Sequence, residues 1–333
     1  NTHSHFLSEI RLSRGPWQAL ERGIARLLEH GGFKDVNVVG GAGDQGADIV
    51  AMKNNERWVI QSKYRSKNDD KVGKSAVQEA FNALKAYNTD VAVTATNQYF
   101  SPDAVKYNQQ KVNLGFKMFL WDKSTLLQNT SRLPIVSRQI RKPWEYQQDA
   151  IEAIFEAIDN GQNKGLLTLA TGLGKTMVAS SVISRFLEVN PSAKILVVAH
   201  MSELVKQLDQ SSWPQLDVNT YTHVWTDGEK PSFNEGVIFA TWQSVEIAYR
   251  NEDIPTNYFD LIIVDECHHA PSTSFSKLLL ELNADFLLGV TATPWRTDNQ
   301  SLRELFGDPL FSMNVVEGMQ NGYLSRVDYT ILT

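Results

Sequence analysis

The chain has 333 residues and a mass of 37.5 kDa, which is the length of two ordinary domains. Hydrophobic residues make up 42% and charged residues 21%, a composition that excludes wholesale disorder. No apolar run is long enough to span a membrane, and the formal net charge of −6 argues at first sight against a nucleic-acid partner.

The charge is divided unevenly along the chain. Residues 1–140 hold 19 Lys and Arg against 13 Asp and Glu, a net charge of +6. Residues 141–333 hold 13 against 25, a net charge of −12. A difference of this size favours two domains with different partners. The single cysteine, Cys267, excludes an internal disulfide and indicates a cytoplasmic location.

The first half mixes helical and extended patterns. Leu20, Ile24 and Leu27 recur at helical spacing, and Asn54-Asn55 separates two strand-like runs as a hairpin turn would. The predicted elements are helices over 17–30 and 75–87 and strands over 36–39, 47–52, 57–63, 91–95 and 116–121. They predict a small mixed α/β domain over residues 1–135.

The second half is organised differently. Two prolines and a basic cluster interrupt the pattern near its start, and we expect a linker over 136–143. Over residues 144–333, helix-length segments separate short, wholly apolar runs at 166–169, 195–199, 237–240, 261–264 and 286–290. Such runs predict a parallel sheet with both faces covered.

One glycine-rich segment follows a predicted strand and opens a helix, which is the context of a phosphate-binding loop. The residues expected to bind nucleotide there are Thr171, Gly172, Gly174, Lys175 and Thr176. Backbone N–H groups of the loop would surround a phosphate, Lys175 would reach the β- and γ-phosphate oxygens, and Thr176 would offer its hydroxyl to Mg²⁺. The alternative is an ordinary glycine-rich turn.

A pair of acids ends a later apolar strand. Asp265 at that position can hold Mg²⁺, and Glu266 can polarise the attacking water. A solvated strand end is the simpler alternative for an isolated acid pair. Here the pair follows Lys175 in the chain and precedes the Thr-Ala-Thr segment 291–293, and this order favours a nucleotide site.

Residues 141–333 thereby resemble the first RecA-like domain of a superfamily 2 helicase or translocase, in its restriction-enzyme and DExH branch. The resemblance implies ATP and Mg²⁺ as cofactors, with His268 in motif II. It implies an adenine-reading segment at Arg141, Tyr146 and Gln147. It also implies a second RecA-like domain, absent from this chain, and possible further C-terminal domains or subunits as partners.

Two further segments match family motifs that touch the sugar-phosphate backbone of DNA. Motif Ia would lie at 199–204, where His200 replaces the usual Pro-Thr, and motif Ib at 241–244. The adjacent His268 and His269 would not share a face on regular structure, which argues against a metal pair.

The hairpin makes a geometric prediction. If Asn54-Asn55 is a two-residue turn, Asp48 lies opposite Gln61, and Gln61 shares a face with Lys63. An acid and an amide oxygen can hold Mg²⁺, while Lys63 can stabilise charge on a reacting phosphate. Without further signals, such residues are more often surface decoration.

The segments around this hairpin resemble the Mrr-type restriction endonuclease domain, a branch of the PD-(D/E)XK nucleases in which Gln replaces the second acid. The resemblance rests on segments 27–33, 43–49, 61–64 and 77–79 and covers about residues 17–130. It implies that Asp48, Gln61 and Lys63 are catalytic, that Asp48 and Gln61 bind the metal, and that Glu21 is the acid of the first helix. A basic stretch follows the site, at Lys63, Arg65, Lys67, Lys71 and Lys74.

The combined interpretation is an α/β enzyme in which a restriction-endonuclease-like domain precedes a RecA-like domain. We expect ATP-dependent DNA restriction, with Mg²⁺-dependent cleavage of double-stranded DNA coupled to a translocase, in bacterial defence and without a membrane partner. One alternative is a repair or recombination helicase whose N-terminal domain binds DNA without cutting it. Another is a non-enzymatic DNA-recognition fragment.

Overall fold

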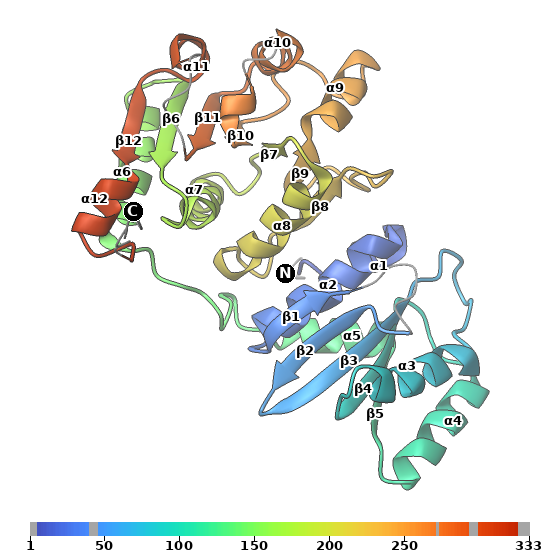
Figure 1. Cartoon of the computed structure of the whole chain (residues 1–333). Coiled ribbons are helices and arrows are strands. Elements are labelled where there is room, and N and C mark those ends of the chain that lie inside the picture. Colours follow the sequence, from blue (N-terminus) through green and yellow to red (C-terminus); the bar gives the residue numbers. More distant parts are fainter. Residues whose placement is uncertain (1–4, 40–45, 271–272, 293–298, 326–333) are drawn as a thin grey trace, which may run out of the picture. The chain divides into compact units, whose positions relative to one another are not determined.

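The computed structural model describes residues 5–39, 46–270, 273–292 and 299–325 (Figure 1). Its internal contacts divide the chain into two compact units. Unit 1 comprises Asn1–Arg141 together with Leu216–Tyr221, and unit 2 comprises Lys142–Gln215 and Thr222–Thr333. The segment Leu216–Tyr221 therefore belongs by contact to the first unit although it lies within the sequence of the second.

Unit 1 is built on a five-stranded mixed sheet in the order β1-β2-β3-β4-β5 (Figure 1). The strands are β1 (Lys34–Val38), β2 (Ile49–Lys53), β3 (Glu56–Lys63), β4 (Val91–Thr96) and β5 (Lys117–Trp121). The first three pair antiparallel, and β4 adds parallel to β3 and β5 parallel to β4. The helices are α1 (Glu9–Arg14), α2 (Trp17–His30), α3 (Lys74–Ala86), α4 (Pro102–Asn113) and α5 (Lys123–Ser131).

The predicted hairpin register is confirmed. Ile49 pairs with Ile60 and Val50 with Val59, so the paired positions sum to 109. Asn54 and Asn55 both have positive φ, at 51° and 64°. Two left-handed residues are what a type I′ turn requires, and asparagine adopts that conformation more readily than most residues.

Sequence reasoning missed the short helices of unit 1. Among the described residues of α4, only Ala104 is buried, so no apolar stripe marks this helix in the sequence. Its start is set instead by Ser101, whose hydroxyl accepts a hydrogen bond from the backbone N–H of Ala104. Asp122 caps α5 in the same way through the N–H of Thr125.

The segment Leu216–Tyr221 is held in unit 1 by a buried arginine. Arg26 on α2 is 1% exposed and donates to the carbonyl oxygens of Thr220 (2.6 Å) and Asp217 (2.9 Å). Val218 adds two backbone hydrogen bonds, one to Phe6 and one to Ile135. A buried charge is tolerated where hydrogen bonds replace water, and here backbone carbonyls accept from both terminal nitrogens of the guanidinium.

Unit 2 has a seven-stranded parallel sheet in the order β12-β6-β11-β10-β7-β9-β8. Its strands are β6 (Lys164–Leu169), β7 (Ile195–Ala199), β8 (Thr222–Trp225), β9 (Val237–Thr241), β10 (Leu261–Asp265), β11 (Phe286–Thr291) and β12 (Pro309–Met313). Its α-helices are α6 (Glu145–Asp159), α7 (Lys175–Val189), α8 (Ser202–Ser212), α9 (Trp242–Arg250), α10 (Thr273–Leu282), α11 (Asn299–Phe306) and α12 (Val315–Gln320). The short 3₁₀ helices are η1 (Trp213–Gln215) and η2 (Cys267–His269).

Both faces of this sheet are covered. On one face, Leu196 and Val198 of β7 join a core cluster with side chains of α9, α10 and α11. Their neighbours Ile195 and Val197 point to the other face because side chains alternate along a strand, and they are equally buried. The predicted fold class, a small mixed sheet followed by a covered parallel sheet, is confirmed.

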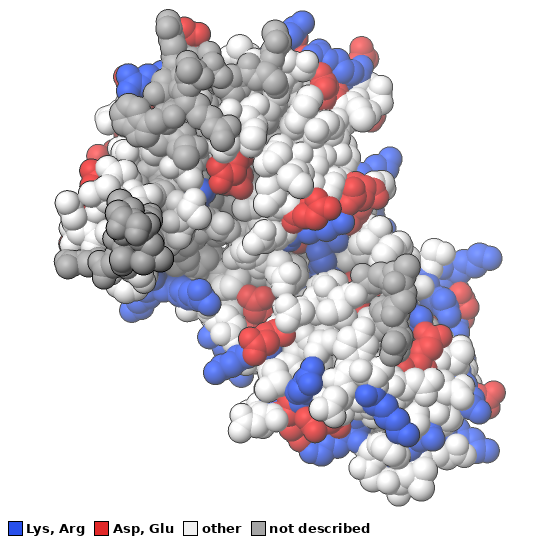
Figure 2. All heavy atoms as spheres, viewed as in Figure 1, with Lys and Arg blue, Asp and Glu red and all other residues white. Residues whose placement is uncertain are grey.

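The surface carries charges of both signs. Figure 2 shows acidic and basic side chains interspersed over the visible face of each unit. Ion pairs explain part of this mixing within the basic stretch of unit 1, where Lys63 pairs with Glu79 (2.7 Å) and Arg65 with Asp70 (3.6 Å). Among the described helices, none is long and apolar enough to cross a membrane.

Candidate active sites

The predicted nuclease residues lie together at the start of β2 and the end of β3. Asp48 and Gln61 are 5% and 4% exposed. The Gln61 amide donates from Nε2 to Asp48 Oδ2 (2.7 Å), and the backbone N–H of Ser62 donates to the same oxygen (2.5 Å). These bonds fix both side chains, and they follow from the hairpin register.

One polar atom of this pair is orphaned. Gln61 Oε1 is buried and has no hydrogen-bond partner among the described residues. A buried amide oxygen without a partner is costly unless a ligand satisfies it, and carboxylate and amide oxygens are ligands that Mg²⁺ accepts. Asp48 and Gln61 therefore fit a hard divalent cation.

Lys63 stands two residues beyond Gln61 and is paired with an acid that sequence reasoning did not select. Lys63 Nζ lies 2.7 Å from Glu79 Oε2, and the side chains are 28% and 45% exposed. Glu79 is on α3, whose first residue, Lys74, is the last member of the basic stretch. The sequence segment 77–79 was part of the Mrr resemblance, but only the fold shows that Glu79 faces Lys63.

Glu21 is half-buried on α2, which packs against β1, β2 and β3. Its expected catalytic role stays a prediction. The glycine-rich segment 40–45, which precedes Asp48, lies outside the described residues.

The nucleotide site begins at the loop between β6 and α7. Gly172 and Gly174 have φ of 89° and 77°, a conformation that L side chains rarely adopt. Lys175 opens α7, and its Nζ lies 3.0 Å from Glu266 Oε1. Thr176 follows at the helix start. The predicted loop residues and the acid pair are thus brought together, as the order of β6, β11 and β10 in the sheet requires.

The acid pair shows a raised pKa at Asp265 and a left-handed backbone at Glu266. Burial raises the pKa of Asp265 to about 6, the charge of Glu266 adds to this rise, and Lys175 opposes it. Glu266 has φ of 47°, a left-handed conformation that is strained for a glutamate. His268 joins the pair to the next strand, because its Nδ1 lies 3.1 Å from Thr291 Oγ1 and 3.3 Å from Glu266 Oε2. Thr293, the last residue of the Thr-Ala-Thr segment, lies outside the described residues.

Tyr146 and Gln147 contact the phosphate loop directly. The Tyr146 hydroxyl (2.8 Å) and Gln147 Nε2 (3.0 Å) both donate to the carbonyl oxygen of Leu173. Gln147 Oε1 accepts from the backbone N–H of Trp144. Arg141, by contrast, belongs by contact to unit 1, where burial raises the pKa of Glu29 and the charge of Arg141 partly opposes that rise. Adenine recognition by these three residues stays a prediction.

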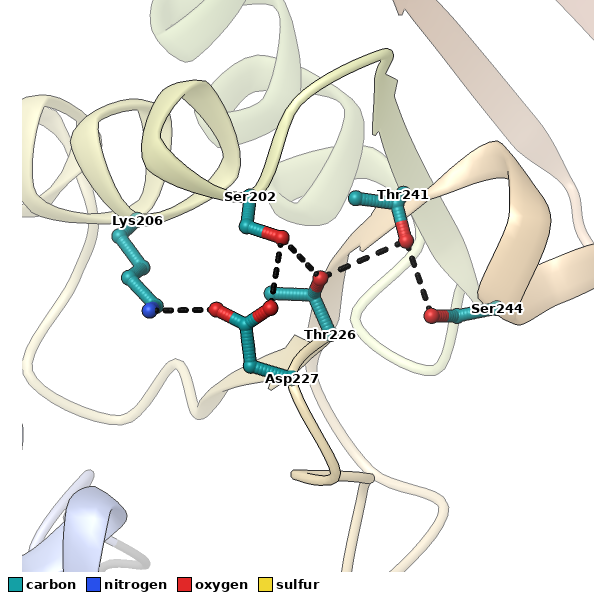
Figure 3. A network of polar contacts seen from close by, with 6 residues as sticks. All are labelled: Ser202, Lys206, Thr226, Asp227, Thr241 and Ser244. Atoms are coloured by element: carbon teal, nitrogen blue, oxygen red, sulfur yellow. Dashed lines mark hydrogen bonds and ion pairs between the residues drawn. The ribbon is translucent and has the colours of Figure 1, made fainter.

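A cluster of hydroxyl groups lies at the same edge of the sheet, after β7, β8 and β9 (Figure 3). We call it the hydroxyl cluster, and its members are Ser202, Thr226, Thr241 and Ser244, with Asp227 and Lys206 beside them. Ser202 Oγ contacts Thr226 Oγ1 (2.7 Å) and donates to Asp227 Oδ1 (2.8 Å). Three of these residues fall in the segments expected to be motifs Ia and Ib.

Cys267 is fully buried, and burial raises the pKa of its thiol, so it is a structural residue. Within the described ranges, no group of three or more His, Cys, Asp or Glu side chains is placed to hold a metal ion. A cation at either site would therefore depend on few protein ligands and on the phosphate groups of its substrate.

The folds and sites define a chain that joins a restriction-endonuclease-like sheet to a P-loop ATPase sheet. Residues 12–129 match the family described as "Restriction endonuclease", Mrr_cat, and residues 140–296 match "Type III restriction enzyme, res subunit", ResIII. The chain contains an Mrr-type restriction endonuclease domain followed by a superfamily 2 helicase domain of the ResIII family.

Curated relatives agree with this assignment. The chain is 29% identical over 232 residues to "Type I restriction enzyme EcoAI endonuclease subunit" from Escherichia coli, a match that covers 64% of this chain and 28% of that protein. It is 28% identical over 233 residues to "Putative ATP-dependent helicase IRC3" from Saccharomyces cerevisiae, covering 65% and 33%. The chain thus spans about a third or less of the length of these relatives.

Solved structures also resemble the chain. "ATP-dependent Type ISP restriction-modification enzyme LlaBIII bound to DNA" is 19% identical, with a TM-score of 0.49, and the match covers 91% of this chain and 24% of that one. "Crystal structure of the UvsW helicase from Bacteriophage T4" is 22% identical, with a TM-score of 0.45, covering 63% and 77%.

Proposed function

We propose that this chain is the nuclease and first motor domain of an ATP-dependent DNA restriction enzyme. It cleaves phosphodiester bonds of double-stranded DNA with Mg²⁺, and ATP hydrolysis in the second unit drives movement along the DNA. The biological role would be cytoplasmic defence against foreign DNA. One observation carries the nuclease assignment: the orphaned Oε1 of Gln61 beside the buried carboxylate of Asp48.

The residues of unit 1 suit this reaction. Asp48 and Gln61 would hold Mg²⁺, which when bound supplies a Lewis acid and lowers the pKa of coordinated water. The Lys63 ammonium would stabilise the negative charge that develops on the phosphate. Lys63 is suited to this role because it follows Gln61 by two residues on β3. Glu79 orients Lys63 through their 2.7 Å ion pair and keeps the ammonium in place before DNA binds.

The residues of unit 2 suit ATP hydrolysis. Lys175 would neutralise the β- and γ-phosphates, and its ion pair with Glu266 orients its side chain at the start of α7. Thr176 and Asp265 would hold Mg²⁺, and Glu266 would then orient the attacking water. Completion of the site requires a second RecA-like domain, and any further C-terminal domains or subunits would act with it.

A second candidate function is a repair or recombination helicase whose first domain binds DNA without cutting it. The helicase relatives favour this alternative, since the match to the IRC3 protein covers about two thirds of the chain. It predicts no cleavage with any metal. The buried Asp48–Gln61 pair disfavours it, because DNA binding alone does not require an orphaned amide oxygen.

Plasmid cleavage tests the proposal. The full-length protein that contains this chain is incubated with supercoiled plasmid, with and without Mg²⁺ and ATP. We expect Mg²⁺-dependent nicking or linearisation that Asp48→Asn abolishes, since the amide removes the charge that attracts the metal. Asp103→Asn, at an exposed aspartate of α4, is the matched control and should cleave as the wild type does. Equal cleavage by Asp48→Asn and wild type would reject the assigned centre.

A further inference from the structure

Three imidazole rings lie in contact, tilted against one another, in a row at the end of the unit 2 sheet. The ring centroids of His268 and His269 are 4.1 Å apart, and those of His269 and His200 are 4.3 Å apart, with 41° between planes in each pair. His200 directly follows β7, whereas His268 and His269 lie in η2, just beyond β10. Since β7 and β10 are adjacent parallel strands, their carboxyl ends bring the three rings to one edge.

This histidine row begins at the nucleotide site. His268 Nδ1 contacts Glu266 Oε2 (3.3 Å), and the other oxygen of Glu266 lies 3.0 Å from Lys175 Nζ. Any ligand that draws Lys175 toward its phosphates therefore changes the charge facing His268. His268 is thus connected to Lys175 of the phosphate loop through the carboxylate of Glu266.

The far end of the row adjoins the hydroxyl cluster. His200 is separated by a single residue from Ser202, whose hydroxyl contacts Thr226 (2.7 Å) (Figure 3). Thr241 in turn contacts Thr226 (3.5 Å) and Ser244 (2.9 Å). Contacts therefore run from the phosphate loop to the start of α9, broken only by the covalent step from His200 to Ser202.

His200 contacts the ring of His269 and interacts electrostatically with Asp265. Its Nδ1 is buried and, among the described residues, has no hydrogen-bond partner. Aromatic rings in contact prefer particular relative orientations, so a neighbouring ring can orient a side chain whose buried nitrogen lacks a hydrogen bond. A movement of His269 would consequently be followed by His200.

We propose that His269 is a positioning residue that couples nucleotide binding to DNA binding. It carries displacements of the acid pair across the gap between β10 and β7 to His200, and so to the hydroxyl cluster at the start of α8. This inference rests on the proposed function, because it takes ATP and duplex DNA as the two ligands. It goes beyond that function by naming the contact through which the two ligands communicate.

The coupling is measured by thermodynamic linkage between DNA binding and nucleotide binding. Duplex DNA affinity of the full-length protein is determined with and without a non-hydrolysable ATP analogue and Mg²⁺, and analogue affinity with and without DNA. The two ratios must agree, and allosteric factors of about 5–150-fold are usual. In His269→Asn, which removes the ring, we expect both ratios to fall to within about 2-fold of one, while each ligand alone binds as in the wild type.

His269→Phe is the matched variant. It keeps an aromatic ring between His200 and His268, so we expect it to retain the wild-type ratio and to melt at the wild-type temperature. An unchanged ratio in His269→Asn, or an equal loss in both variants, would overturn the inference. Ligand binding without coupling in the wild type would also overturn it, whereas a wild type that binds no nucleotide would reject the proposed function as well.

Discussion

The two candidate sites are assembled from the chain in opposite ways. Asp48, Gln61 and Lys63 lie on neighbouring strands of a single hairpin, so their meeting depends only on the register of that hairpin. The nucleotide site gathers segments after β6, β10 and β11, which become neighbours because of the strand order of the whole sheet. The nuclease centre is thus a local structure, and the nucleotide site is a product of global topology.

This difference has a physical consequence. A slip of one residue in the hairpin would turn Gln61 away from Asp48, because successive side chains of a strand point to opposite faces. The nucleotide site depends instead on which strands are neighbours, because its residues come from the ends of different strands. The two sites share no residue, so variants should separate them.

The largest effect is expected at the acid pair of unit 2. Glu266→Gln should lower ATP hydrolysis by the full-length protein about 10²–10⁴-fold, because it removes a group expected to take a proton from water. Nucleotide binding should persist, since Lys175 remains. Steady-state phosphate release and analogue binding measure the two quantities. Glu188→Gln, at an exposed glutamate of α7, is the matched control, and loss of binding in Glu266→Gln would contradict the assigned role.

The next effect concerns the orphaned amide of the nuclease centre. Gln61→Leu should reduce Mg²⁺-dependent cleavage by at least about 100-fold, because it removes a metal ligand and the bond that orients Asp48. Gln61→Glu should keep activity, since a carboxylate oxygen can replace the amide oxygen. Plasmid nicking rates across Mg²⁺ concentrations provide the readout. Full activity in the leucine variant would show that Gln61 does not bind the metal.

Several features of both sites could be predicted from the sequence, and others could not. The register around Asn54-Asn55 followed from the turn residues alone, and the loop at Lys175 from its glycines. The partner of Lys63 could not be predicted, because Glu79 reaches it from α3 by tertiary packing. The contact between His268 and His269 could not be predicted either. Their adjacency in the sequence argues against a shared face, but the short 3₁₀ helix η2 brings the two ring centroids to 4.1 Å.

That Leu216–Tyr221 belongs to unit 1 could not be predicted from the sequence either. Its anchor, Arg26, lies on a helix whose pattern indicates a buried apolar face, and an arginine there would ordinarily be assigned to the surface. Only the folded chain brings the carbonyl oxygens of Asp217 and Thr220 to its guanidinium. Unit 1 consequently depends on a buried charge.

This dependence predicts an effect on stability. Arg26→Met should destabilise unit 1 by about 2–4 kcal/mol, because two partly buried carbonyl oxygens lose their charged donor. Hydrogen exchange of the α2 amides measures this free energy locally, and the β10 amides of unit 2 should exchange as before. Arg132→Met, at an exposed arginine, is the matched control. Equal protection of α2 in both variants would contradict the anchoring role.

The smallest effect concerns pH. Burial raises the pKa of Glu29 to about 7, whereas burial lowers the pKa of His30 to about 4. Because its pKa is raised, the contribution of Glu29 to the stability of the fold is fully present below about pH 4.5. It is lost as the pH rises through about 7. His30 has the opposite dependence, so its contribution is present above about 6.5 and is lost as pH falls through about 4.

The two residues therefore oppose each other in mildly acidic solution. At pH 8 only the cost of ionising Glu29 remains, and Glu29→Gln should stabilise unit 1 by on the order of 1 kcal/mol. At pH 4 the two proteins should be equally stable. Thermal unfolding at both pH values measures the difference, and a gain that is the same at pH 4 and pH 8 would rule out ionisation as its cause.

The nuclease and nucleotide sites lie on one chain, and we expect them to be chemically independent. The most direct test measures Mg²⁺-dependent plasmid nicking without ATP, and binding of an ATP analogue, on Lys63→Ala, Lys175→Ala and the control Lys106→Ala, an exposed lysine of α4. We expect reciprocal losses: Lys63→Ala binds the analogue but does not nick, Lys175→Ala nicks but does not bind it, and Lys106→Ala does both. Nicking that survives Lys63→Ala, or analogue binding that survives Lys175→Ala, would contradict this expectation.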